Sequence, residues 1–181
     1  MNSYKDETVV AFGIDEAFAP HLAVTMTSVV ANAPDANFLF LVVHDGVSAE
    51  HKRRIEQCAG RHRVKWAEIS DSRFIQLQGI DHISRATYFR LAVASLLPPE
   101  TKRAIYLDVD IVVIGNVNEL ASVDLKGQPI GAVFDPGIDA TVFANEHGLK
   151  PVPHAYFNAG MMVIDLEKVR ASHAFEHAFE V

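Results

Sequence analysis

Apolar runs alternate along the chain with stretches in which apolar residues recur at helical spacing. Residues 9–14 and 38–43 form continuous apolar runs, the pattern of strands buried on both faces of a sheet. Between them, residues 20–32 carry apolar side chains three and four positions apart and predict a helix that opens at Pro20. This alternation predicts an α/β protein with a mostly parallel sheet flanked by helices on both sides.

The same alternation continues to the end of the chain. Ser48 is the predicted N-cap of a helix over residues 48–59, and Gly60 is its predicted C-terminal stop. The other expected elements are a weak strand over 64–69, a helix over 84–97, an apolar run over 104–114, strands over 129–134 and 157–164, and a closing helix over 166–179. No repeat or linker interrupts them, so we expect residues 1–181 to form a single domain.

The most informative feature is a pair of aspartates, Asp108 and Asp110, within the apolar run 104–114. Residues two apart on a strand share a face, and two carboxylates about 5 Å apart at an effective dielectric near 20 repel by about 3 kcal/mol. A divalent cation resolves this conflict, and carboxylate oxygens suit Mg²⁺ or Mn²⁺. The run resumes at Ile111, which argues against a strand that ends at Leu107 with aspartates that only cap a loop.

An Asp-x-Asp pair after an apolar strand has two well-known uses. One is the metal site of nucleotide-sugar glycosyltransferases, and the other is the nucleophile and acid pair of haloacid-dehalogenase-like phosphatases. Residues 108–112 fit the phosphatase pattern literally. Phosphatases of that class carry the pair on their first strand, however, whereas several α/β elements precede Asp108 here. The position of the pair therefore favours the first use and leaves the second as an alternative.

Composition limits the ligands that the protein can bind and the cellular setting that it fits. The formal net charge of −7 argues against broad nucleic-acid binding, and a polyanionic ligand would need a cation or a well-placed arginine. The one cysteine, Cys58, cannot form an intrachain disulfide, which fits a reducing, cytoplasmic setting. No apolar run approaches the roughly 18 to 20 residues of a membrane span, and the polar start lacks the pattern of a signal peptide.

Four linked segments, read outward from the aspartates, resemble family-8 retaining glycosyltransferases, especially bacterial lipopolysaccharide galactosyl- and glucosyltransferases. They are residues 12–15 with Phe18, 82–84 followed by 87–91, 106–110, and 156–160. The resemblance implies a Rossmann-like nucleotide-sugar-binding sheet of the GT-A type. It also implies hexose transfer with retention from a UDP-sugar to a saccharide or glycolipid acceptor such as lipopolysaccharide core, at the cytoplasmic side of the inner membrane. Front-face attack and double displacement both stay open, because no nucleophile is visible.

The resemblance also implies roles for individual residues. Asp108 and Asp110 are the implied ligands of the Mn²⁺ or Mg²⁺ that bridges the donor diphosphate. Asp15 is implied to hydrogen-bond the uridine, and Phe18 to stack on the uracil. Asp135 and Asn158 form the implied catalytic set at the transferred sugar, and His82 and Thr87 are implied to lie on the acceptor side. The other implied donor-binding residues are Gly13, Ile14, Arg90, Val109, Asn158 and Ala159.

The sequence departs from the family pattern in three places. Ala17 stands where relatives often carry Asn, and Phe18 where they often carry Tyr. The chain ends at Val181, before an Asp-Gln-Asp segment and a His-x-x-Gly-x-x-Lys-Pro-Trp segment that gives relatives a third metal ligand. We therefore expect the C-terminal part of the enzyme to be missing and transfer by this chain to be poor. A truncated, non-catalytic domain that binds nucleotide, or self-associates through bare sheet surface, is the further alternative.

Overall fold

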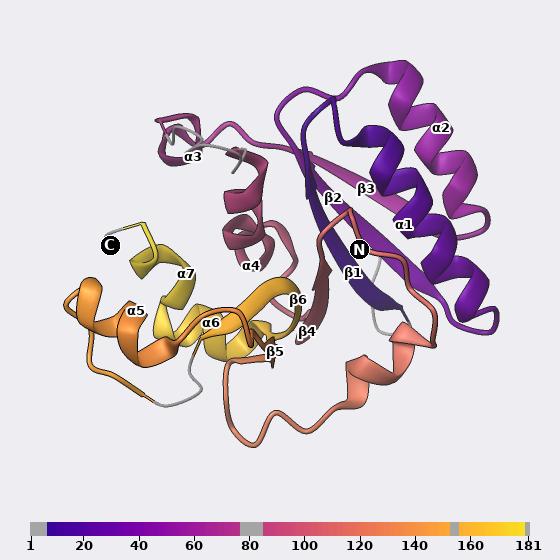
Figure 1. The fold of residues 1–181 in the computed structure, drawn as a ribbon. Helices are drawn as coiled ribbons and strands as arrows, with labels where there is room; N and C mark the ends of the chain where they lie inside the picture. Colours follow the sequence, from indigo (N-terminus) through magenta and orange to yellow (C-terminus); the bar gives the residue numbers. More distant parts are fainter. Residues whose placement is uncertain (1–6, 77–84, 153–155, 180–181) are drawn as a thin grey trace.

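A six-stranded sheet with the strand order β3-β2-β1-β4-β6-β5 forms the centre of the protein (Figure 1). The computed structural model describes residues 7–76, 85–152 and 156–179. The strands are β1 (Thr8–Ile14), β2 (Phe38–His44), β3 (Arg63–Glu68), β4 (Arg103–Leu107), β5 (Ile130–Phe134) and β6 (Phe157–Asp165). The pairs β1–β2, β2–β3 and β1–β4 are parallel, and β6 is antiparallel to both β4 and β5. The expected α/β class with a mostly parallel sheet is confirmed.

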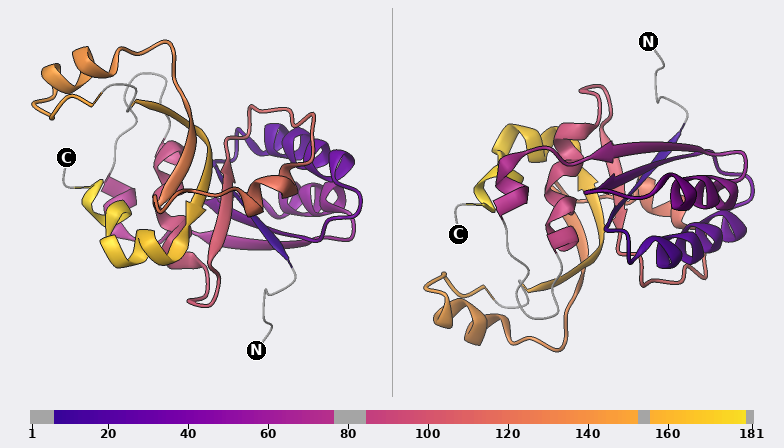
Figure 2. Two further views of the ribbon diagram at one scale, coloured as in Figure 1. Left: turned by 90° about the horizontal axis from the view of Figure 1, so that it is seen from below. Right: turned by 90° about the horizontal axis from the view of Figure 1, so that it is seen from above.

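Helices cover both faces of this sheet (Figures 1 and 2). On one face, α1 (Ala19–Asn32) and α2 (Ala49–Ala59) pack on a core that contains Phe12 and Phe40. On the other face, the core contains Phe89 and Tyr106. The elements that supply this second layer are the 3-10 helix η1 (Arg85–Ala92) and the helices α3 (Ser72–Gln76), α4 (Val93–Leu96), α6 (Leu166–Ser172) and α7 (Ala174–His177). Each fully buried large side chain contributes about 1.5–3 kcal/mol to this double core.

The first elements match their predicted bounds within one residue, because their apolar patterns are strong and local. Ser48 is the N-cap of α2 as predicted, and its Oγ accepts a hydrogen bond from the His51 amide over 3.3 Å. Gly60 ends the helix with a φ of 61°. Among the described residues, no helix combines the length and the apolar character that crossing a bilayer requires.

Two predicted helices are divided in the structure. The helix expected over residues 84–97 winds as the 3-10 helix η1 and becomes α-helical only in α4, while residue 84 lies outside the described residues. The closing helix expected over 166–179 breaks into α6 and α7 at His173, whose φ of 51° is left-handed. The elements α3, α5 (Ala140–Glu146) and the 3-10 helix η2 (Val117–Ser122) were not predicted.

The prediction for residues 104–114 was wrong in its geometry. Strand β4 ends at Leu107, the two aspartates lie in the turn that follows, and the segment beyond leaves the sheet. The physical reason is a set of hydrogen bonds to α1: Thr25 Oγ1 lies 2.6 Å from the Val109 carbonyl oxygen and 2.8 Å from that of Ile111. The carbonyl groups that would pair with a neighbouring strand if β4 were longer thus contact the Thr25 hydroxyl of α1 instead.

Candidate functional site

One edge of the sheet collects the predicted polar residues. Strands β1 and β4 are parallel, so their carboxyl ends meet there and place Asp15 and Asp108 at the same edge. Strand β6 is antiparallel to β4, so it begins at this edge with Asn158 near its start. Strand β5 pairs with β6 and ends there too, just before Asp135. The topology therefore brings four distant segments together, as the alternation of strands and helices predicts.

Asp108 is held by three different elements. Its backbone amide donates to the Gly160 carbonyl of β6 over 2.7 Å. Its Oδ1 accepts a hydrogen bond from Arg90 Nη2 of η1 over 3.0 Å and another from the Tyr106 hydroxyl of β4, also over 3.0 Å. Charge-assisted bonds of this kind are roughly twice as strong as neutral ones. The carboxylate of Asp108 is therefore fixed in orientation before any ligand arrives.

Arg90 is itself constrained along its whole guanidinium. Nε donates to the Thr87 carbonyl over 2.6 Å, Nη1 donates to the Ala159 carbonyl, and the group lies 4.8 Å from the centre of the Tyr106 ring. Only 12% of the Arg90 side chain is exposed. The expected positive charge is thus present in the site, and it lies directly against Asp108.

Tyr106 is a site residue to which the sequence assigned no role. Its side chain is buried, and this burial raises the pKa of the phenol far above its usual range, so the hydroxyl stays protonated and donates to Asp108. The available signal was its position two residues before Asp108 in an otherwise apolar run. Strand periodicity alone could not show which side chain its hydroxyl would meet.

Two glycines at the site allow close approach of neighbouring groups. A Cβ at Gly160 would lie 2.9 Å from Asp108 Oδ2 and 2.9 Å from Asn158 Oδ1, so this position preserves space beside both oxygens. A Cβ at Gly13 would lie 3.0 Å from the Ala86 carbonyl oxygen. The absence of a side chain at Gly13 therefore allows η1 to pack closely on β1.

A pocket of about 180 Å³ lies at this edge of the sheet. Phe18 is 38% exposed at its rim, with its ring 5.1 Å from that of His21, and Asp110 is exposed beside it. The residues that line the pocket are Gly13, Phe18, Ala86, Thr87, Tyr106, Asp108, Val109 and Asp110. Six of these eight were predicted as donor- or acceptor-binding residues, so the structure gathers the core of the predicted site around one hollow.

Comparison with known proteins decides the family. The family profile described as glycosyl transferase family 8 matches residues 9–181 of this chain. The chain belongs to glycosyl transferase family 8. It is 28% identical to the lipopolysaccharide 1,3-galactosyltransferase of Salmonella typhimurium over 188 residues, which cover 100% of this chain and 55% of that protein. It is 27% identical to a lipopolysaccharide 1,2-glucosyltransferase of Escherichia coli, over 95% of this chain and 52% of that protein.

The fold agrees with this membership. The crystal structure of the galactosyltransferase LgtC in complex with donor and acceptor sugar analogs matches with a TM-score of 0.79 and 25% identity, over 96% of this chain and 65% of that chain. The sheet is therefore of the GT-A type, and the family match gives the haloacid-dehalogenase alternative no support. The family-8 chain spans about half to three-fifths of the length of the curated relatives that it matches.

Several predicted residues have positions that limit what they can do. The Ile14 side chain is fully buried, so only its backbone can face a ligand. Asp15 Oδ1 accepts a hydrogen bond from the Phe18 amide over 3.1 Å, and Asp135 Oδ1 accepts one from the Gly137 amide over 2.9 Å. Asp135 does not line the pocket. His82 lies outside the described residues.

Asn158 does not occupy the tight turn that its neighbours Ala159 and Gly160 favour. It lies in β6, at an irregularity where the register with β5 shifts, and its Oδ1 accepts a hydrogen bond from the Gly160 amide over 2.8 Å. The Asn158 side chain is therefore folded back onto Gly160, where its Oδ1 and Asp108 Oδ2 would both lie 2.9 Å from an added Cβ.

The donor atoms fit a hard divalent cation in one specific way. Oδ1 of Asp108 accepts hydrogen bonds from Arg90 Nη2 and the Tyr106 hydroxyl over 3.0 Å each, whereas Oδ2 has a longer contact of 3.4 Å with Arg90 Nη2 and lies beside the space that Gly160 leaves open. Asp110 offers a second, exposed carboxylate. In the part of the chain that the structure describes, no group of three or more His, Cys, Asp or Glu side chains is placed to hold a metal. A cation here would complete its shell with phosphate and water oxygens.

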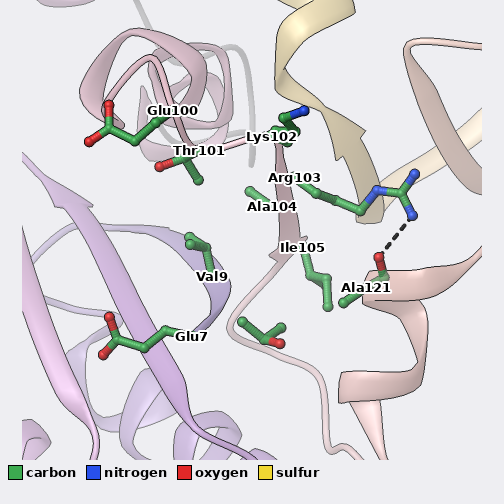
Figure 3. Close-up of a pocket in the computed structure, with 10 residues that line it drawn as sticks. Glu7, Val9, Glu100, Thr101, Lys102, Arg103, Ala104, Ile105 and Ala121 are labelled. Atoms are coloured by element: carbon green, nitrogen blue, oxygen red, sulfur yellow. Dashed lines mark hydrogen bonds between the residues drawn. The ribbon is translucent and has the colours of Figure 1, made fainter. Parts of the chain in front are cut away.

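A second cavity, of about 350 Å³, lies at the opposite edge of the sheet (Figure 3). It opens where β1 and β4 separate, before their pairing begins at Val10 and Ile105. Thr101 borders it with a buried hydroxyl that has no hydrogen-bond partner among the described residues. None of the predicted site residues lines this cavity, so it is separate from the candidate site.

Proposed function

We propose that residues 1–181 form the nucleotide-sugar-binding unit of a retaining hexosyltransferase that uses a UDP-hexose as donor. The observation that carries the proposal is the fixed carboxylate of Asp108 beside Asp110, at a pocket whose rim bears the exposed ring of Phe18. This is the arrangement that a diphosphate joined to a planar base requires. An aromatic face supports the base, and the carboxylates hold the cation that a diphosphate needs.

The charges of the site support a cation, Mn²⁺ or Mg²⁺, between protein and donor. Two carboxylates, Asp108 and Asp110, line the pocket, and one guanidinium, that of Arg90, pairs with Asp108, so the bare site would repel a diphosphate. A bound divalent cation supplies Lewis-acid stabilisation of the departing UDP. Tyr106 and Arg90 hold Oδ1 of Asp108 over 3.0 Å, so Oδ2, which lies 3.4 Å from Arg90 Nη2, is the oxygen proposed to bind the cation. The Arg90 charge would remain near the diphosphate.

The remaining residues are proposed to orient the two sugars. Asn158 and Asp135, at the start of β6 and the end of β5, would hold hydroxyls of the transferred hexose. Asp15 and the Gly13 backbone would contact the uridine. Thr87, on the pocket wall, and His82 would face the acceptor, for which we propose a saccharide or glycolipid of the lipopolysaccharide-core type at the cytoplasmic side of a membrane. The names of the matched relatives support this class of acceptor.

A second candidate is a nucleotide-binding domain that associates with itself and does not catalyse transfer. The observation that favours it is the exposed apolar surface of β5, α5 and the start of β6, where Val133 is 53%, Val142 52% and Phe157 42% exposed. With two protein carboxylates for the cation, we expect weak metal binding and slow transfer by this chain alone.

Nucleotide selectivity tests the proposal. Calorimetric titration with UDP, ADP and CMP in the presence of Mn²⁺ should show binding of UDP at least tenfold tighter than that of the other two. Hydrolysis or transfer from UDP-galactose and UDP-glucose, followed by UDP release, then separates the enzyme from the non-catalytic domain. Equal affinity for all three nucleotides would contradict the nucleotide-sugar site.

A further inference from the structure

The turn that carries Asp110 lies outside the sheet, yet its backbone is tied to one helix. Strand β4 ends at Leu107, and beyond Asp110 the side chains of Val112 and Ile114 are 63% and 89% exposed. Val109, which is buried, packs in the same core as α1. Apolar packing therefore anchors this segment at separate points and leaves the backbone around Asp110 to be fixed by other contacts.

Those contacts are hydrogen bonds from one stripe of α1. Thr25, whose side chain is fully buried, places its hydroxyl 2.6 Å from the Val109 carbonyl and 2.8 Å from the Ile111 carbonyl, which are the residues on either side of Asp110. Two further side chains bind the backbone of Val113, two residues beyond Ile111. The Val113 amide donates to Ser28 Oγ over 2.9 Å, and Asn32 Nδ2 donates to the Val113 carbonyl over 2.9 Å.

We propose that Thr25, Ser28 and Asn32 are positioning residues that hold the Asp110 turn in the geometry the divalent cation requires. They lie three and four residues apart, so they share one face of α1. The inference rests on the proposed function, in which Asp110 is a cation ligand. It adds a feature that the Asp-x-Asp motif does not contain, because separate contacts position each aspartate. Arg90 and Tyr106 bind the Asp108 carboxylate, and α1 binds the backbone on either side of Asp110.

Hydrogen bonds from α1 would pre-organise the Asp110 turn for the cation. When a loop becomes ordered only on ligand binding, its loss of conformational entropy reduces the binding free energy. A loop that is already fixed avoids this loss. The hydroxyl of Thr25 lies within bonding distance of the carbonyls before and after Asp110, so it restricts the backbone on both sides of that one residue. Loss of this restraint should weaken cation binding without touching any cation ligand.

Thr25→Val tests this, because valine keeps the β-branched shape and removes only the hydroxyl. Thr27→Val is the matched control: it is the same change on the same helix, at an exposed residue whose hydroxyl bonds only to the Ala23 carbonyl of α1. Thr25→Ser keeps the hydroxyl and should restore the wild-type behaviour. If Thr25→Val does not fold, Asn32→Ala replaces it, since Asn32 is exposed and its loss leaves the buried core intact.

Two readouts are needed, and one of them is independent of the metal. Hydrogen exchange of the metal-free protein should show segment 108–114 exchanging at least fivefold faster in Thr25→Val than in Thr27→Val. The Mn²⁺ dissociation constant in the presence of UDP should rise at least threefold in Thr25→Val and stay within error in Thr27→Val and Thr25→Ser. Faster exchange with an unchanged Mn²⁺ constant, or no change in exchange, would overturn the inference. If the wild-type chain binds no Mn²⁺ at all, the proposed function fails, and the exchange result alone then decides whether α1 holds the turn.

Discussion

Arg90 Nη2 donates to Asp108 Oδ1 over 3.0 Å and so joins a 3-10 helix on one face of the sheet to the turn at the end of β4. The same guanidinium also donates to carbonyls of Thr87 and Ala159. One side chain therefore fixes the relative positions of η1, β4 and β6 around the pocket. Its charge offsets that of Asp108 until a cation and a diphosphate share the site.

Replacing Arg90 should harm both stability and donor binding. We expect Arg90→Ala to lower the free energy of unfolding by about 1.5–3 kcal/mol, because a partly buried charged hydrogen-bond network is lost. In the presence of Mn²⁺, its UDP dissociation constant should rise about tenfold or more, which equals about 1.4 kcal/mol. Arg90→Lys keeps the charge but not the fork of donors, so it should recover only part of the affinity. Urea denaturation and calorimetry give the two values.

The matched control for this change is Arg85→Ala. Arg85 lies on the same 3-10 helix, but its ion pair is with Asp45 and not with Asp108. Its loss should leave the affinity for UDP within about twofold of the wild type. An equal loss of affinity in the two variants would mean that disturbance of η1, rather than the charge at Asp108, explains the effect.

Gly160→Ala should reduce metal-dependent binding through space alone. The added Cβ would lie 2.9 Å from Asp108 Oδ2, the oxygen proposed to bind the cation, so that oxygen or the backbone of β6 must move. We expect the Mn²⁺ dissociation constant to rise at least fivefold. Gly115→Ala is the control, because a Cβ there meets nothing within 4 Å. Unchanged Mn²⁺ binding in Gly160→Ala, measured by electron paramagnetic resonance, would show that Oδ2 is not a ligand.

Stability should fall as the pH falls below neutral, because two buried histidines are held neutral. Burial lowers the pKa of His44 and of His62 from the ordinary value of 6.5. In both rings Nδ1 accepts a backbone hydrogen bond, from Gly46 over 3.1 Å and from Phe38 over 3.3 Å. Below pH 6.5 the unfolded chain binds these protons before the folded chain does, so the free energy of unfolding decreases.

Urea midpoints at pH 7.5 and pH 5.5 measure this effect. His44→Asn keeps an acceptor near Nδ1 and removes the titrating ring, so the drop in midpoint between the two pH values should become smaller. His173→Asn, at an exposed position in the left-handed region that asparagine tolerates, should leave the drop unchanged. A pH dependence that is identical in His44→Asn and the wild type would show that His44 does not contribute.

The exposed apolar surface of β5 and α5 should make the chain associate with itself. We expect the sedimentation coefficient to rise with concentration, and Val133→Lys to suppress that rise by placing a charge on an edge strand. Val24→Lys is the control, since Val24 is similarly exposed at 58% but lies on α1, far from β5 (Figure 1). If both variants suppress association equally, net charge and not this surface is responsible.

The parts of the fold that could be predicted from sequence are those set by local patterns. Strands β1 and β2 are continuous apolar runs, and α2 has its cap and its stop within its own sequence, so each was placed within one residue. That several candidate site residues lie at one pocket could be expected, because they follow apolar runs and resemble the motifs of one family. The assignment of Asp108 and Asp110 as metal ligands remains a prediction.

The main error has a different cause, which is contact between residues far apart in the chain. Residues 104–114 read as one strand because Ile111 resumes the apolar pattern, but a hydroxyl 84 residues away, that of Thr25, takes the Val109 carbonyl. The contact of Tyr106 with Asp108 also depends on where β4 stops. Neither hydrophobic periodicity nor motif spacing records such hydrogen bonds, so only the folded structure reveals them.

The most direct measurement is a calorimetric titration of UDP into the purified chain with Mn²⁺, with EDTA, and with Mn²⁺ in the Asp110→Asn variant. The account predicts binding with Mn²⁺, loss of most of that affinity in EDTA, and a similar loss in Asp110→Asn, with an unchanged free energy of unfolding for the variant. Binding of UDP that is equally tight in all three conditions would contradict the assignment of Asp108 and Asp110 as the cation-holding pair of a nucleotide-sugar site.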